Sequence, residues 1–222
     1  MRPQFTSNEL AGDRARALAL TPVSRETEAR LDAFVDCLLG RQRTTNLIAS
    51  STVPHLWTRH IADSLQLLAL APNASVWVDL GSGAGFPGLI IACALAGRAG
   101  AVVHLVESIN KKCAFLRDAV AATGAPAAVH CARIEDFTKH FNDRADVITA
   151  RALAPMPVLL SYVQPLMKTG AQAILMKGQD VGAELTDSSK YWNIRASLVA
   201  SKTSASSKIV IIDGVESRKS KG

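Results

Sequence analysis

The sequence has few cysteines and no long apolar run. Its four cysteines are far apart and form no C-x-x-C pair, which excludes a disulfide framework and a cysteine zinc cluster and indicates a reducing compartment. The histidines other than His60 show no metal-ligand spacing, so we expect no metal. The longest apolar run, residues 89–96, is too short to cross a bilayer, and the first residues lack the apolar core of an export signal. The sequence therefore predicts a cytoplasmic protein with no membrane partner.

The remaining composition suits a compact domain. The chain has 222 residues and is 48% hydrophobic, enough for one core. Its 25 Lys and Arg against 19 Asp and Glu give a net charge of +6, which fits an anionic partner such as nucleic acid but is common among soluble enzymes. A monomer is favoured, although nothing in the sequence fixes the oligomeric state.

Apolar spacing divides the chain into a helical part, an α/β part and a short tail. Residues 1–72 are predicted to form an N-terminal helical cap, with one helix beginning after Ser24. A second helix is expected from residue 53 or 54 to 70, with Leu56, Ile61, Leu65 and Leu68 facing inward. Residues 73–216 are predicted to form the α/β domain, and residues 217–222 a basic tail, all within one compact unit.

The α/β part alternates short apolar runs with helical segments, which favours a mostly parallel, Rossmann-like sheet covered on both faces. An antiparallel hairpin is expected at its end. Seven strands are predicted, over residues 76–80, 101–106, 127–131, 146–150, 171–176, 194–200 and 208–212. Helices are expected over residues 87–96, 110–122 and 157–167, and residues 132–145 are expected to form a surface stretch.

A glycine-rich loop follows the first predicted strand. Gly81, Gly83 and Gly85 alternate after a strand that carries Asp79, a pattern typical of methyltransferases that use S-adenosylmethionine. A dinucleotide fingerprint, G-x-G-x-x-G, also exists in a shifted register that ends at Gly88, so the loop alone leaves NAD open.

Two further segments fit an adenosine-type ligand. Glu107 ends the second predicted strand, and a carboxylate there can accept both ribose hydroxyls of either S-adenosylmethionine or NAD. After the third strand, residues 133–137 place an apolar side chain beside carboxylates, which suits an adenine ring and its amino group. Phe86 is the aromatic side chain of the loop that we consider for contact with the ligand.

With these residues in view, the chain resembles the glucose-inhibited division protein B family of bacterial small-subunit rRNA methyltransferases, which modify guanine at N7. The anchors are the Arg59-His60-x-x-Asp63-Ser64 element, the loop from Asp79 to Gly88, Glu107-Ser108, Arg151-Ala152 and Lys177-Gly178. The family's charged Glu-Arg pair before the last strand is replaced here by Ser206-Ser207, which leaves the contribution of the last hairpin to RNA binding open.

The resemblance implies a class I methyltransferase sheet, S-adenosylmethionine as the cofactor, and 16S rRNA or the small ribosomal subunit as the partner. It implies cofactor contacts at Gly81, Phe86, Ile134, Glu135 and Arg151, with Glu107 as the ribose carboxylate. Gly83 and Gly85 belong to the same loop and are expected to contact the cofactor.

Methylation at guanine N7 needs no general base, because this nitrogen carries a lone pair and no proton. Asp63, His60 and Arg151 are the candidates for a catalytic role. Because guanine becomes cationic on methylation, an Asp63 carboxylate would stabilise the transition state more than the ground state. Arg59 and Asp63 are also spaced for an ordinary helical ion pair. Arg59 and Lys177 are the candidate RNA contacts.

Two other functions stay open at this point. An NAD-dependent oxidoreductase would use the same glycine-rich crevice, but the acid that hydride chemistry requires is not evident. A non-catalytic RNA-binding module would keep the fold but would have no use for the glycine loop and Glu107.

Overall fold

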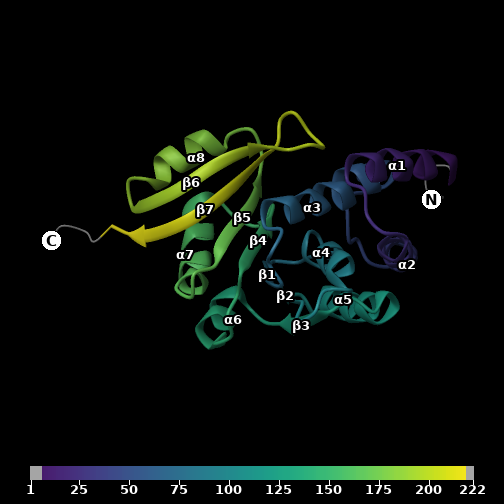
Figure 1. Ribbon diagram of the computed structural model, residues 1–222, viewed down its shortest axis with the longest axis horizontal. Coiled ribbons are helices and arrows are strands. Elements are labelled where there is room, and N and C mark those ends of the chain that lie inside the picture. The colour runs from purple at the N-terminus through teal and green to yellow at the C-terminus, as the bar shows by residue number, and fades with distance from the viewer. Residues whose placement is uncertain (1–6, 219–222) are drawn as a thin grey trace.

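A seven-stranded sheet forms the centre of the protein, in the order β3-β2-β1-β4-β5-β7-β6 (Figure 1). The computed structural model describes residues 7–218. Five strands are parallel: β1 (Val76–Leu80), β2 (Val102–Glu107), β3 (Ala127–Cys131), β4 (Val147–Arg151) and β5 (Gln172–Lys177). β6 (Trp192–Ala200) and β7 (Lys208–Ser217) form an antiparallel hairpin that joins the sheet through β5. The predicted Rossmann-like sheet with its final hairpin is confirmed.

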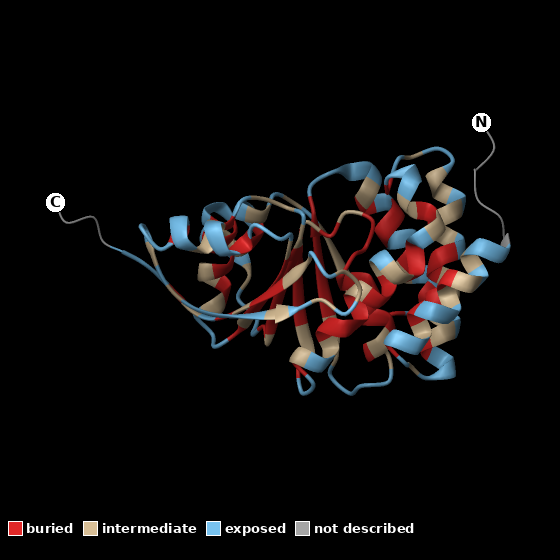
Figure 2. Cartoon of the chain, turned by 90° about the horizontal axis from the view of Figure 1, so that it is seen from above, coloured by how far each residue is buried: buried red, intermediate tan, exposed pale blue. Residues whose placement is uncertain are grey.

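Helices cover both faces of the sheet. α4 (Gly88–Leu95) and α5 (Asn110–Thr123) share one apolar core with the N-terminal helices. α6 (Ile134–His140), α7 (Met156–Met167) and α8 (Val181–Ser188) enclose a second core on the other face. Neighbouring strand residues divide between the cores: Trp77 enters the first and Val78 the second. The strands are therefore buried between two helical layers (Figure 2), which explains their nearly continuous apolar sequence.

The N-terminal part is helical, as predicted. α1 (Ser7–Leu20) precedes α2 (Arg25–Gln42), and the side chain of Ser24 caps α2 by accepting a hydrogen bond of 3.2 Å from the backbone N–H of Thr27. α2 packs on α5 and α4 through a stripe that includes Leu31 and Phe34, both fully buried.

The second predicted helix occupies the expected residues but changes its winding several times. It consists of η1 (Ser50–His55, 3₁₀), η2 (Trp57–Ala62, π), α3 (Asp63–Leu65) and η3 (Gln66–Leu70, 3₁₀). A π turn holds more residues than an α turn and rotates the faces of the residues after it. For this reason Leu67 is fully buried, whereas Leu68, predicted to face inward, is half-buried.

A buried carboxylate from α1 caps the start of η2. Oδ2 of Asp13 accepts hydrogen bonds from the backbone N–H groups of Trp57 (2.8 Å) and Thr58 (3.1 Å), and its Oδ1 accepts from the Thr58 hydroxyl at 2.8 Å. Asp13 is fully buried, and an ion pair with Arg16 at 3.2 Å offsets its charge. Helices 44 residues apart in the sequence are thus joined by one side chain.

The structure differs from the sequence prediction at two helices and at the end of β7. α6 lies where a surface stretch was predicted, and α8 was not predicted. Residues 217 and 218 are described, with Ser217 ending β7, whereas residues 219–222 of the predicted basic tail lie outside the described residues. Within residues 7–218, no helix has the length and apolar character needed to cross a bilayer.

Candidate active site

Two adjoining cavities open at the carboxyl ends of the parallel strands, the edge at which α/β sheets bind ligands. One, of about 340 Å³, lies over the ends of β1, β2, β3 and β4 and includes Gly81, Gly83 and Glu107 in its wall. The other, of about 720 Å³, lies over β4, β5 and β7 and is lined by Arg59, His60 and Asp63 from the helical cap. We call them the loop cavity and the cap cavity. They meet at Arg151 and Ala152, which line both.

The glycine loop adopts a backbone conformation that excludes side chains. Gly81, Gly83 and Gly85 have φ values of +71°, +56° and +94°. A Cβ atom on Gly81 would lie 2.6 Å from Cδ1 of Leu153, a residue in the wall of the loop cavity. Glycine at this position therefore keeps the wall open and the turn unstrained.

Glu107 binds the loop directly. Its Oε2 accepts a hydrogen bond of 3.0 Å from the backbone N–H of Gly83, and its Oε1 accepts one of 2.8 Å from that of Ile109. Each carboxylate oxygen has a further lone pair, so Glu107 can still accept ribose hydroxyls from the loop cavity. Sequence reasoning placed Glu107 correctly at the end of β2 but missed its contact with the loop.

Gly88, the last glycine of the shifted G-x-G-x-x-G pattern, has a packing role. A Cβ on Gly88 would lie 2.5 Å from Leu105 Cδ2 and 2.6 Å from Cβ of Asp79, so Gly88 allows α4 to pack on the sheet. Asp79 is fully buried and accepts hydrogen bonds from Gly88 N–H (3.2 Å) and the Thr149 hydroxyl (2.7 Å). Burial raises the pKa of Asp79 to about 6. Asp79 holds strand, loop and helix together.

The far wall of the loop cavity comes from α6 and α7. Ile134 and Glu135 begin α6, and Oε1 of Glu135 accepts a hydrogen bond of 2.8 Å from the Tyr162 hydroxyl on α7. The structure thus brings Ile134 and Glu135 to the same cavity as Gly81, Gly83, Glu107 and Arg151. Tyr162 was missed, because its sequence neighbourhood carries no motif.

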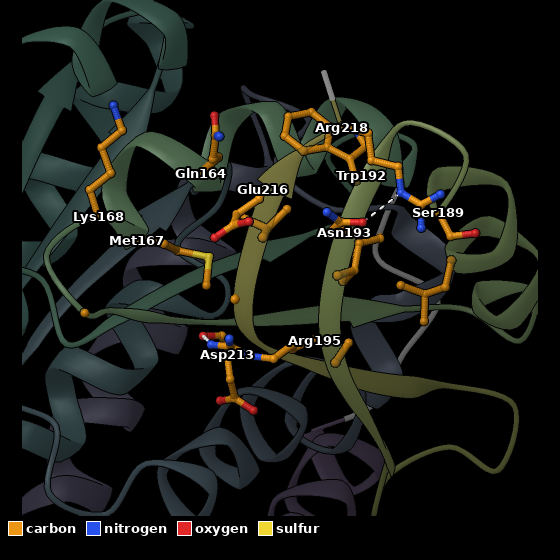
Figure 3. A pocket seen from close by; sticks show the side chains of 16 residues that line it. Gln164, Met167, Lys168, Ser189, Trp192, Asn193, Arg195, Asp213, Glu216 and Arg218 are labelled. Atoms are coloured by element: carbon orange, nitrogen blue, oxygen red, sulfur yellow. Dashed lines mark hydrogen bonds between the residues drawn. The ribbon is translucent and has the colours of Figure 1, made fainter. Parts of the chain in front are cut away.

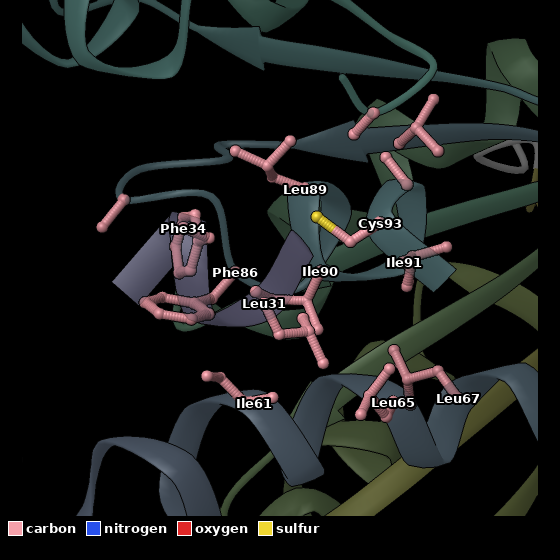
Figure 4. Close-up of a cluster of buried hydrophobic side chains, with 14 of the residues drawn as sticks. Leu31, Phe34, Ile61, Leu65, Leu67, Phe86, Leu89, Ile90, Ile91 and Cys93 are labelled. Carbon is pink, nitrogen blue, oxygen red and sulfur yellow. The ribbon is translucent and has the colours of Figure 1, made fainter. Parts of the chain in front are cut away.

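Phe86 differs from this group. Its side chain is only 4% exposed and lines neither cavity. The ring packs edge-on against Phe34 at 5.4 Å (Figure 4). It also stacks on His60 at 4.8 Å. Gly85 is also absent from the cavity wall, and a Cβ there would lie 3.1 Å from Leu89 and 3.3 Å from Phe34. The loop directs Phe86 into the core, so contacts of Gly85 and Phe86 with a cofactor stay predictions.

Asp63 lies in the cap cavity and is paired with Arg151. The distance from its Oδ2 to NH1 of Arg151 is 3.8 Å, and these side chains are 16% and 20% exposed. In the described part of the chain the ion pair of Asp63 is thus with Arg151, and the predicted helical pair with Arg59 is wrong. The physical reason is η2: a π turn does not align residues four apart as an α-helix does.

His60 is held between the core and the cap cavity. Its Nε2 lies 3.2 Å from the Thr52 hydroxyl, its ring stacks on Phe86, and its Nδ1 is buried without a hydrogen-bond partner among the described residues. Burial, together with the positive charges of Arg151 and Arg59, lowers the pKa of His60 to about 3. His60 is therefore a neutral imidazole at pH 7.

The two candidate RNA contacts, Arg59 and Lys177, differ in exposure and in whether their charge is paired. Arg59 is exposed, and its backbone carbonyl accepts a hydrogen bond of 3.4 Å from Arg151. Lys177 is 12% exposed, and its Nζ lies 2.7 Å from Oε2 of Glu184 and donates to the Ala154 carbonyl at 3.3 Å. The charge of Lys177 is already balanced by Glu184. Among residues 7–218, Arg59 forms no ion pair, so its charge is available to an anion.

Arg151 ends β4 at the junction of the two cavities. Its guanidinium lies over the Phe86 ring at 5.1 Å, in addition to its contacts with Asp63 and Arg59. The next residue, Ala152, has φ of +49°, a left-handed conformation that costs an alanine about 1 kcal/mol. The strain turns the chain so that one short segment serves both cavities.

Comparison with known proteins identifies the family. The family model described as rRNA small subunit methyltransferase G matches residues 27–210. The chain belongs to this family. A relative named ribosomal RNA small subunit methyltransferase G from Bradyrhizobium sp. (strain ORS 278) is 60% identical over 211 residues, which cover 95% of each chain. One of the same name from Nitrobacter hamburgensis is 59% identical over 98% of this chain and 84% of its own.

Solved structures support the fold of this family member. The cofactor-bound Rv0187 from MTB superposes with a TM-score of 0.59 at 13% identity, over 94% of this chain and 99% of its own. A mutant of MtNAS in complex with S-adenosylmethionine gives 0.55 at 15% identity, over 92% and 77%. The predicted family and the predicted fold class are confirmed, and the oxidoreductase and binding-module alternatives are not favoured.

A larger cavity, of about 910 Å³, lies elsewhere on this family member (Figure 3). It is lined by the end of α7, by α8 and by the β6–β7 hairpin, and includes Lys168 and Gly170, which precede β5. Its position at the amino end of β5, opposite the glycine loop, argues against a role in nucleotide binding despite its size. No cluster of His, Cys, Asp and Glu able to hold a metal ion occurs within residues 7–218.

Proposed function

We propose that this protein transfers a methyl group from S-adenosylmethionine to N7 of a guanine in 16S rRNA of the small ribosomal subunit. The observation that carries the proposal is the junction at Arg151: a cavity lined by glycine loop and carboxylate adjoins a second cavity lined by Asp63 and basic side chains. The first suits the donor and the second the acceptor base. Family membership supports the same activity.

The residues present fit the donor. The loop cavity combines a backbone wall without side chains at Gly81 and Gly83, a carboxylate at Glu107 and an apolar side chain at Ile134. Such a set can receive an adenosine, with the ribose hydroxyls donating to Glu107 and Ile134 against the base. When bound, S-adenosylmethionine supplies an electrophilic methyl group on a sulfonium. We expect micromolar affinity, about −8 kcal/mol, and no affinity for NAD.

The acceptor is activated by position and by charge. Guanine N7 uses its in-plane lone pair to form the new carbon–nitrogen bond, and the electrons of the broken carbon–sulfur bond stay on sulfur. No proton moves, so no general base is required. The chain holds the base in line with the methyl group, and Asp63 and Arg151 set the electrostatic field as the purine becomes cationic. A carboxylate favours that charge more than it favours neutral guanine.

The further proposals follow from this activity. Arg59 and, after its ion pair with Glu184 opens, Lys177 contact rRNA phosphates. We place the protein in the cytoplasm, where the small subunit is the substrate, and propose that it acts as a monomer. We also propose that residues 1–72 act as a cap on the catalytic domain of residues 73–216, with residues 217–222 as a basic tail.

Two measurements test the proposed function. Nucleoside analysis of 16S rRNA from cells with and without the gene should show loss of one 7-methylguanosine, and purified protein should restore it. Unchanged 7-methylguanosine would contradict the assignment. Isothermal titration with S-adenosylmethionine and NAD separates the donor from the oxidoreductase cofactor, since heat from NAD alone would exclude a methyltransferase.

A further inference from the structure

The turn between β6 and β7 closes one side of the cap cavity. Residues 201–207 join the two strands, and Ser201, Thr203, Ser204 and Ser207 line the cavity opposite the helical cap. Figure 1 shows this turn at the upper end of the hairpin, on the side of the molecule where α3 lies. Two hydroxyl groups of the turn, those of Ser201 and Thr203, contact Asp63 of α3.

Asp63 on α3 receives these contacts on one oxygen. Oδ1 of Asp63 accepts hydrogen bonds from the Thr203 hydroxyl at 2.6 Å and the Ser201 hydroxyl at 3.3 Å. It also accepts from Nε2 of Gln66 at 2.7 Å, and Gln66 returns to the turn by accepting from the backbone N–H of Lys202 at 2.8 Å. Three donors saturate Oδ1 and fix the plane of the carboxylate.

The other carboxylate oxygen of Asp63, Oδ2, still has free hydrogen-bonding capacity among the described residues. In the described part of the chain, Oδ2 has one polar contact, the ion pair with Arg151, and at 3.8 Å this is beyond hydrogen-bond distance. Oδ2 can therefore accept a hydrogen bond from a molecule in the cap cavity. Arg151, the partner of Oδ2, lies at the junction of the two cavities and is also held by the Arg59 carbonyl and the Phe86 ring.

We propose that Ser201 and Thr203 are positioning residues of the acceptor site, which hold Asp63 so that Oδ2 and Arg151 face the guanine. The inference rests on the proposed function, and it gives the β6–β7 turn a part in catalysis. A purine nucleotide of RNA is the ligand class: guanine offers N–H donors to Oδ2, and its growing positive charge interacts with the same carboxylate.

The test compares variants that keep or remove one hydroxyl. Thr203→Val preserves shape and removes the donor, and we expect kcat with small-subunit particles to fall about tenfold, the effect of one hydrogen bond to a charged group. Thr203→Ser retains the donor and should restore kcat. The dissociation constant of S-adenosylmethionine should be unchanged in both variants, because the loop cavity does not include Thr203.

Ser206→Ala is the matched control, since Ser206 lies in the same turn, is exposed and lines neither cavity. It should match the wild type. Equal kcat for Thr203→Val and the wild type would overturn the proposal. Equal loss in Thr203→Val and Thr203→Ser would also overturn it, because it would indicate a structural role of the turn.

A second readout does not depend on methyl transfer. The hydroxyl bonds lower the pKa of Asp63 against the rise caused by burial. The Asp63 carboxyl, followed by ¹³C NMR in a pH titration and assigned with Asp63→Asn, should therefore titrate at higher pH in Thr203→Val than in the wild type. Arg151, Arg59 and His60 face the same cavity and stay unchanged between the two proteins. Identical titration would overturn the positioning role. Wild-type protein that methylates no rRNA would instead overturn the proposed function.

Discussion

At the scale of single residues, Glu107 combines two tasks, because it fixes the backbone of Gly83 and Ile109 and faces the loop cavity. Glu107→Gln removes the charge and turns an amide N–H₂ toward one of two backbone donors. We expect the affinity for S-adenosylmethionine to fall by about 2 kcal/mol, or roughly thirtyfold, measured by isothermal titration. Glu216→Gln makes the same change at an exposed residue of β7 and should bind as the wild type does. If Glu107→Gln bound S-adenosylmethionine as tightly as the wild type does, Glu107 would not be the residue that binds the ribose hydroxyls.

Gly81 offers a second test on the same scale, because Gly100 has the same φ of +71° but open space where a Cβ would lie. Gly100→Ala should cost about 1–2 kcal/mol of unfolding free energy from the backbone conformation alone. Gly81→Ala adds the contact with Leu153. It should therefore lower the unfolding free energy more than Gly100→Ala does, and it should also weaken the binding of S-adenosylmethionine. Urea denaturation and isothermal titration of the two variants measure this. Equal costs in stability and unchanged binding would show that Leu153 yields freely and that the loop needs no glycine here.

At the scale of secondary-structure elements, the packing of the N-terminal helices depends on the hydrogen bonds that Asp13 accepts from η2. Asp13→Ala leaves the first N–H groups of η2 without their acceptor in a buried place, and we expect a loss of about 3 kcal/mol of unfolding free energy. Urea denaturation checks the value. Asp36→Ala, at an exposed carboxylate on α2, is the control and should change stability by less than about 0.5 kcal/mol. If Asp13→Ala also lost less than about 0.5 kcal/mol, η2 would be stable without the hydrogen bonds to Asp13.

The elements also show how far the sequence leads. The parallel strands were predicted to within a residue at each end, because strands buried on both faces are apolar throughout and are bounded by turns. The glycine loop and Glu107 were found by local spacing. Local spacing failed at η2, where the π turn changed which residues align and separated Arg59 from Asp63. α6 and α8 have only seven and eight residues, too few for apolar spacing to distinguish a helix from a surface stretch.

The partners of Asp63 could not be read from the sequence at all. Ser201 and Thr203 lie 138 and 140 residues away along the chain, and serine and threonine in a polar turn carry no signal of a buried acceptor. Only the closure of the sheet, with β7 inserted between β5 and β6, brings the turn to α3. The residues of the candidate site at strand ends could therefore be placed from the sequence, whereas its tertiary contacts could not.

At the scale of the whole molecule, stability should respond to pH through His60. Burial lowers the pKa of His60 to about 3, below the ordinary 6.5. Between these values the unfolded chain binds a proton that the folded chain does not, so the free energy of unfolding decreases as the pH falls below 6.5. Asp79, whose pKa burial raises to about 6 from 3.8, contributes a slope of opposite sign between those values.

A variant isolates the contribution of His60. Urea denaturation between pH 4.5 and 7.5 should give a steeper rise of stability with pH for the wild type than for His60→Gln, with no further divergence above about pH 6.5. His55→Gln, at an exposed histidine, should follow the wild type. Parallel curves for the wild type and His60→Gln would show that His60 is as easily protonated in the folded protein as in the unfolded chain.

Because one guanidinium, that of Arg151, borders both hollows, the affinities for donor and RNA are thermodynamically linked. Whatever factor the presence of one ligand imposes on the dissociation constant of the other, the second must impose the same factor in return. The same reciprocity relates the dissociation constants of the demethylated donor and of the modified particle.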